Sequence, residues 1–76
     1  MNKQRRERLV QLAERIEAIR LDLEALRFEE QDALDNMPES LQNSARGEAM
    51  QTVIDQLEDA ECDLDGALAS VEASSE

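Results

Sequence analysis

The stretch Leu34-Asp35-Asn36-Met37-Pro38-Glu39-Ser40-Leu41-Gln42-Asn43-Ser44-Ala45-Arg46-Gly47-Glu48 decides the fold, because it holds the only proline and one of the two glycines of a 76-residue chain. Pro38 lacks an amide hydrogen and its ring clashes with a preceding helical turn, so a helix arriving from the N-terminal side ends near Asn36. Asn43 and Ser44 can cap a second helix, and Glu48 suits its positive end. A connection this short predicts two antiparallel helices.

Before the turn, apolar residues recur in alternating steps of three and four, which is the spacing of a and d positions in a coiled coil. The positions are Leu9, Leu12, Ile16, Ile19, Leu23 and Leu26, and the series continues through Glu30, Ala33 and Met37. The spacing predicts a helix over residues of about 3–36, with this whole seam buried against the second helix. Glu30 stands where an apolar residue is expected, and we expect Leu34 beside it to cover the gap.

After the turn the same spacing returns. The second seam consists of Met50, Ile54, Leu57, Leu64, Leu68 and Val71, with Glu61 in one seam position. We expect a helix over about 44–73, a turn over about 37–43 and a tail over 74–76. The fold class is therefore all-α, a single domain over 1–76 built as an antiparallel helical hairpin. In that hairpin Glu61 falls near Arg20 or Arg27, which would pair its carboxylate.

A second apolar stripe suggests that the hairpin self-associates. Leu21 and Phe28 are seven residues apart and lie away from the first seam, with Ala25 next to them. Val53, Ala60 and Ala67 form a smaller stripe beside the second seam. Two helices alone bury little apolar area for each residue that they order. We therefore expect two hairpins to pack through both stripes into a four-helix bundle, as a homodimer.

The composition excludes several classes of function. The chain has no His, Tyr or Trp, and Phe28 is its only aromatic residue, so catalysis by a histidine base and histidine-containing metal sites are ruled out. Cys62 is the only cysteine, so no internal disulfide can form, and a cytoplasmic location is the default. No apolar run approaches the roughly 18 residues of a membrane span. We expect no enzyme activity and no cofactor.

The net charge of −11 is unevenly spread. Residues 1–38 carry a net charge of −2 and residues 39–76 a net charge of −9. Direct binding to nucleic acid is not expected, because little positive charge is available to neutralise phosphates. An acidic helical surface could instead imitate DNA phosphates and inhibit a DNA-handling enzyme. The candidate residues for such a surface are Asp55, Glu58, Asp59, Asp63 and Asp65.

A metal site is a more distant alternative. Glu29, Glu30 and Asp32 before the turn, and Glu58 and Glu61 after it, offer carboxylates three residues apart on helices. Carboxylate oxygens suit Mg²⁺, which often bridges phosphates. This spacing resembles that of all-α nucleoside triphosphate pyrophosphohydrolases. Acids at this spacing are almost unavoidable in a chain with 19 of them, so a structural role for the two seam carboxylates is favoured.

The segment 29–48 resembles a family of small, acidic helical-hairpin proteins of bacteria and phages. The shared pattern is a pair of acids, then Asn36-Met37-Pro38-Glu39, then Leu41-Gln42, then Ser44, Arg46 and Glu48. The resemblance covers about a quarter of the chain. It implies the hairpin and a prokaryotic or phage context, and it carries no reaction.

These observations favour a non-enzymatic, oligomeric protein–protein interaction or regulatory module. Its expected self-interface or partner interface is Leu21, Ala25, Phe28, Val53, Ala60 and Ala67. Neither nucleic acid nor a membrane is expected as a direct partner. The polar residues of the turn, among them Gln42 and Ser44, are expected to hydrogen-bond the exposed helix ends and fix the reversal.

Overall fold

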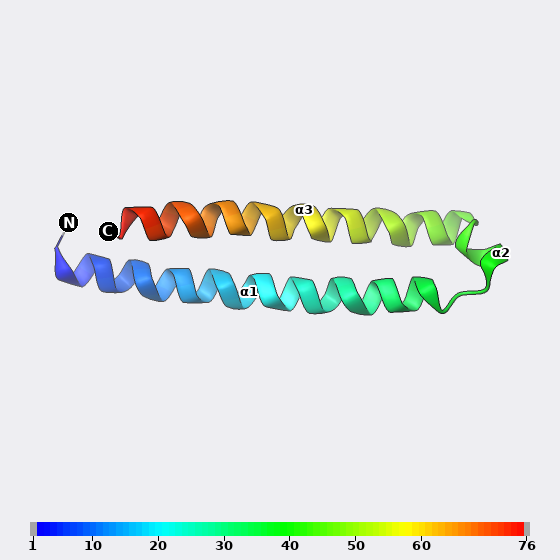
Figure 1. The fold of residues 1–76 in the computed structure, drawn as a ribbon, viewed down its shortest axis with the longest axis horizontal. Helices are drawn as coiled ribbons and strands as arrows, with labels where there is room; N and C mark the ends of the chain where they lie inside the picture. Colours follow the sequence, from blue (N-terminus) through cyan, green and yellow to red (C-terminus); the bar gives the residue numbers. More distant parts are fainter. Residues whose placement is uncertain (1, 76) are drawn as a thin grey trace.

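A computed structural model describes residues 2–75 of the chain as two long helices joined by one short one. Helix α1 covers Lys3–Asp35, α2 covers Glu39–Gln42 and α3 covers Ala45–Ser74. Helices α1 and α3 lie antiparallel and side by side along almost their whole length, with the two ends of the chain together at one end of the molecule (Figure 1). The described residues contain no strand and span 59 × 14 × 12 Å. The all-α hairpin expected from the sequence is confirmed.

Side chains cap the starts of both long helices, and the backbone caps the end of α1. Asn2 Oδ1 accepts a hydrogen bond from the Arg5 amide at 2.8 Å at the start of α1, and the Asn36 backbone amide donates to the Asp32 carbonyl at its end. Ser44 caps α3, accepting from the Gly47 amide at 3.5 Å. Helix α3 continues to Ser74, one residue beyond the end expected near residue 73. Glu76 lies outside the described residues.

The turn is held by Gln42 and closed by Gly47. The Gln42 side-chain amide donates to the Leu34 carbonyl at 3.1 Å and to the Met37 carbonyl at 3.0 Å. These bonds satisfy carbonyls that the end of α1 leaves without helical partners. A Cβ atom on Gly47 would lie 2.1 Å from the Gln42 carbonyl oxygen, so α2 can approach the first turn of α3 only because residue 47 is glycine.

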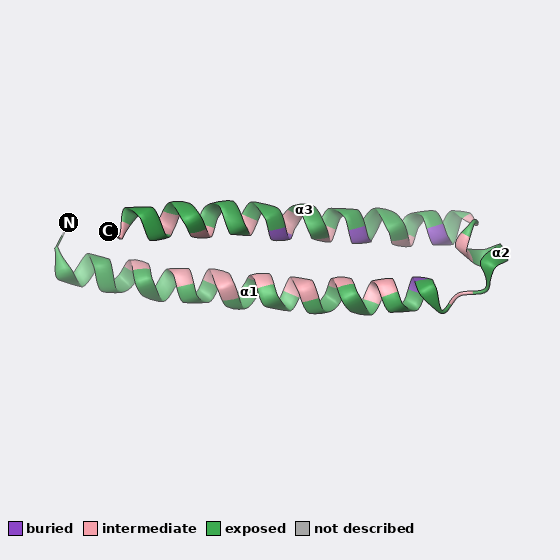
Figure 2. Cartoon of the chain, viewed as in Figure 1, coloured by how far each residue is buried: buried purple, intermediate pink, exposed green. Residues whose placement is uncertain are grey.

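The second predicted seam is confirmed. All its positions in α3 face α1, and Ile54 is the most deeply buried side chain, 2% exposed (Figure 2). From the end of α1, Leu34 packs into this core and is 9% exposed, as expected.

The first predicted seam is only half right. In α1, Leu9, Ile16 and Leu23 are half-buried, but Leu12, Ile19 and Leu26 are exposed by 43%, 52% and 52%. Ala33, the next residue of this series, is exposed as well. The residues that take their place against α3 are Ala13, Arg20, Arg27 and Leu34, each one position further along. Helix α1 is therefore rotated relative to the expected packing, so that half of its predicted seam, the row from Leu12 to Ala33, lies outside the contact with α3.

Candidate interaction surfaces

One long side of the hairpin, which we call the ion-pair flank, is built around two arginines of α1. Arg20 contacts Glu17 at 2.7 Å and Glu24 at 3.2 Å within its own helix, and Asp65 of α3 at 3.3 Å. The Arg20 guanidinium lowers the pKa of Glu17, chiefly through its hydrogen bond to that carboxylate. The network ties α1 to α3 by charge as well as by apolar packing.

Glu61 is the buried member of this flank. It is 8% exposed, and Arg27 Nε donates to its Oε2 at 2.6 Å. The hydrogen bond to Glu61 raises the pKa of Arg27 above its ordinary value, with Glu58, 3.8 Å away, adding to the effect. The seam carboxylate of α3 is thus paired with an arginine, as the sequence predicted. Glu30, the corresponding carboxylate of α1, is half-buried.

The opposite long side is apolar, and we call it the apolar flank. It consists of Leu12, Ile19, Leu26 and Ala33 of α1 with Val53, Ala60 and Ala67 of α3. Ile19 and Leu26 directly precede Arg20 and Arg27, the two arginines that reach α3. Because successive helical residues lie about 100° apart around the axis, Ile19 and Leu26 lie beside the contact with α3, on the side opposite to the ion-pair flank. Every member of the flank except Ala60 is exposed.

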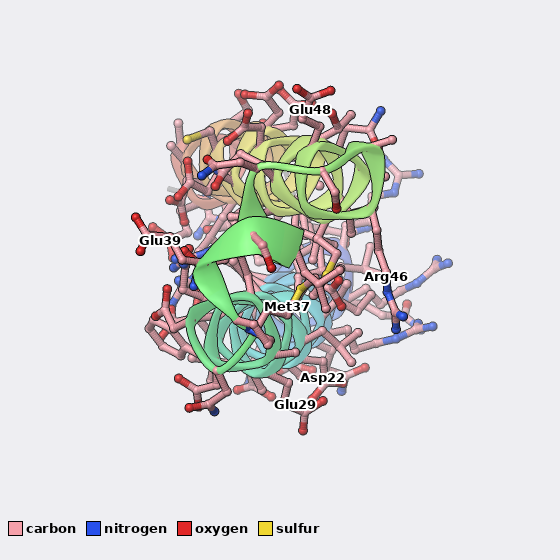
Figure 3. All side chains as sticks on the ribbon, turned by 90° about the vertical axis from the view of Figure 1, so that its right-hand side faces the viewer. Asp22, Glu29, Met37, Glu39, Arg46 and Glu48 are labelled. Atoms are coloured by element: carbon pink, nitrogen blue, oxygen red, sulfur yellow. The ribbon has the colours of Figure 1, made fainter. Side chains whose placement is uncertain are left out.

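The two rows of the apolar flank lie on the same side of the hairpin. Figure 3, an end-on view, shows Arg46 of α3 and Asp22 of α1 projecting to one side, and Glu39 to the other. Val53, Ala60 and Ala67 follow Arg46 at intervals of seven residues, which keeps them on its side of α3. Ile19 stands three residues before Asp22, a spacing that puts it on the neighbouring part of the same helix surface.

The register of the hairpin places large residues of one row beside small residues of the other. The ion pairs Arg20–Asp65 and Arg27–Glu58 fix this register. It brings Leu26 close to level with Ala60, Ile19 with Ala67, and Ala33 with Val53. The flank is therefore one continuous apolar strip along the molecule.

The interface expected from the sequence does not form one surface. Phe28 lies against Arg27, whose guanidinium carbon is 4.7 Å from the ring centroid, so Phe28 belongs to the side of the ion-pair flank. Leu21, seven residues earlier, shares that side, and Ala25 lies on the exposed back of α1. Val53 and its two alanines lie on the apolar flank instead. The expected set is thus divided between different sides of the hairpin.

The acidic surface expected from the sequence is divided as well. Glu58 and Asp65 contact arginines of α1, which offset their charge. Asp55, Asp59 and Asp63 follow one another at intervals of four residues and are exposed, so they form one row along α3. The five acids are therefore divided into two that pair with arginines and three that line the solvent-facing side of α3.

The described residues contain neither a cluster of metal ligands nor a membrane-spanning helix. Between residues 2 and 75, no three His, Cys, Asp or Glu side chains are close enough together to hold a metal ion. Nor does this part of the chain contain a helix with the length and apolar character needed to cross a membrane. Cys62 is a free, exposed thiol.

Comparison with protein-family models, with curated proteins and with solved structures found no match to this chain. The resemblance of segment 29–48 to acidic hairpin proteins of bacteria and phages therefore stays a prediction.

Sequence reasoning missed the apolar flank because it assigned Leu12, Ile19 and Leu26 to the buried seam. The signal that could have found it was present. Arg20 and Arg27 each stand directly after a residue of the predicted seam. Helix α3 carries acids, Glu58 and Asp65, at the same interval of seven residues. Pairing these charges requires α1 to turn its arginines toward α3, which moves the preceding leucine and isoleucine outward.

Proposed function

We propose that this protein is a non-enzymatic, cytoplasmic protein–protein interaction module that works as a homo-oligomer of helical hairpins. The observation that carries the proposal is the apolar flank. It presents Leu12, Ile19 and Leu26 to solvent in a row on one helix, each about half exposed. Isolated exposed leucines are ordinary, whereas a contiguous apolar strip with polar margins is typical of an interaction site.

The small core of the hairpin supports the same proposal. Within residues 2–75 only Leu34 and Ile54 are buried apolar side chains. Covering the apolar flank would add a second core of comparable length, as in a four-helix bundle. The free Cys62 thiol agrees with a reducing compartment.

Sedimentation velocity over a wide range of protein concentrations tests this function. We expect the full chain to sediment as a dimer. The variant Ile19→Lys should shift the equilibrium toward monomer, because dimerisation would remove the hydrating water from the lysine ammonium group. Leu21→Lys is the matched control, since this leucine is exposed to the same degree, 50% against 52%, on a different side. A wild-type protein that stays monomeric at all concentrations would overturn the proposal.

A further inference from the structure

We infer that the apolar flank is covered by the same flank of a second copy, with the two α1 helices antiparallel and a twofold axis passing Ile19. This inference rests on the proposed function and names its partner and geometry. Residue 19 is the midpoint of α1, which covers Lys3–Asp35, so an axis at this point gives full overlap of the two α1 helices. Ile19 then meets the partner's Ile19, and Leu12 meets the partner's Leu26.

The side of the hairpin that carries the flank is large enough for a stable dimer. The whole side measures 59 × 14 Å, on the order of 800 Å², which is the area that each partner contributes to a standard interface, and the flank occupies the residue 12–33 part of α1, about 32 Å of this length. A twofold axis also makes the contact isologous, so the assembly stops at two copies and cannot extend into a filament.

The charges along the margin of the flank decide whether the two α1 helices of the dimer run antiparallel or parallel. The residues at seven-residue intervals beside the α1 row are Arg8, Arg15, Asp22 and Glu29, two cations followed by two anions. An antiparallel contact centred on Ile19 places Arg15 opposite the partner's Asp22 and Arg8 opposite the partner's Glu29. Each pair occurs twice, so all eight charges find an opposite charge. A parallel contact would place these two rows on opposite edges of the interface, where Arg15 of one copy does not meet Asp22 of the other.

Contact with α3 of a second copy does not use this pattern. The corresponding margin of α3 carries Ala49, Gln56, Asp63 and Ser70. One acid in this row cannot pair with two cations and two anions in series. Keeping the register of the hairpin would moreover place Asp22 opposite the partner's Asp63. The self-complementary charges along α1 therefore favour α1 of the second copy, rather than its α3, as the helix that packs on α1.

Charge exchange tests the pairing. Arg15→Glu and Asp22→Arg each replace two attractive pairs in the dimer with two repulsive ones, and we expect each to weaken dimerisation on the order of tenfold. In a 1:1 mixture the heterodimer regains both attractions, so native mass spectrometry should show it in excess of the statistical half. Lys3→Glu and Glu14→Arg, which change the net charge equally away from the flank, should mix statistically.

Cross-linking tests the direction separately. In a Cys62→Ser background, Leu12→Cys and Leu26→Cys are prepared as separate proteins and treated with a short bifunctional thiol reagent. The antiparallel dimer predicts cross-linking when the two are mixed, and little when either is treated alone. Self-linking of Leu12→Cys would mean parallel helices and would overturn the inference.

The outcomes separate the two proposals. A wild-type dimer without preferential heterodimer formation and without mixed cross-linking overturns the antiparallel geometry and leaves the interaction module standing. A wild-type monomer overturns both. Heterodimer excess together with mixed cross-linking supports both.

Discussion

Arg27 of α1 donates through Nε to Glu61 of α3 at 2.6 Å, at a point where Glu61 is only 8% exposed. A buried carboxylate requires such a partner. Because Arg27 must face α3 to reach it, the preceding residue, Leu26, is turned to the outside. One ion pair thus satisfies the polar residue of the seam and also sets the rotation that leaves the apolar flank exposed.

Removing only one member of this pair should destabilise the hairpin more than removing both. Arg27→Met leaves the buried Glu61 carboxylate without its donor, whereas Arg27→Met combined with Glu61→Leu replaces both charges with apolar groups. We expect the single variant to have the lowest urea midpoint and the double variant to recover most of the loss. The measurement needs one fixed protein concentration, because self-association contributes to stability. A double variant no more stable than Arg27→Met would contradict the account.

Replacing each of the two glycines with alanine should change the stability of the hairpin in opposite directions. Gly47→Ala forces a Cβ to within 2.1 Å of the Gln42 carbonyl oxygen, so the turn must shift, at a cost of about 1–3 kcal/mol in the free energy of unfolding. Gly66→Ala meets no atom within 4 Å and should stabilise α3 by about 1 kcal/mol. Urea unfolding of both variants checks the pair. Equal stability of Gly47→Ala and wild type would show that the close approach at the turn is not required.

The amide group of Gln42 should matter more than its size. Gln42→Ala removes the donor to the Leu34 and Met37 carbonyls and should cost about 1 kcal/mol. Gln42→Glu keeps the shape but sets a carboxylate against carbonyl oxygens at the negative end of α1, so it should cost more. Amide hydrogen exchange across residues 34–47 reports both effects. Faster exchange in Gln42→Ala than in Gln42→Glu would contradict this order.

The turn and α3 were predictable from the sequence, and the orientation of α1 was not. Pro38 and Ser44 act locally, so their effect on the helix ends can be derived without knowing the partner. The large apolar residues of α3, Ile54 among them, lie in one stripe, and the stripe through Val53 beside it is smaller, so only one face of α3 is suited to the core. Helix α1 has two comparable stripes, one through Ile16 and one through Ile19, and long-range pairing of its arginines selects between the faces. Periodicity alone contains no information on that choice.

The Arg20 network predicts an acid-sensitive contribution to stability. Arg20 lowers the pKa of Glu17 below its ordinary value of 4.5. A carboxyl group whose pKa is lower in the folded state stabilises that state above the ordinary pKa, and the contribution is lost as the pH falls through the lower, folded value. An NMR titration of the Glu17 carboxyl should therefore have its midpoint below 4.5 in the wild type and a higher midpoint in Arg20→Gln. An unchanged midpoint in the variant would rule out Arg20 as the cause.

Small-angle X-ray scattering tests whether two hairpins cover each other's apolar flanks along their length. One chain has a mass of 8.6 kDa and a long dimension of 59 Å. We predict a scattering mass of two chains with a maximum dimension close to that of one hairpin, and a return to the mass of one chain in Ile19→Lys. A mass of one chain for the wild type, or a doubled mass with a doubled length, would contradict it.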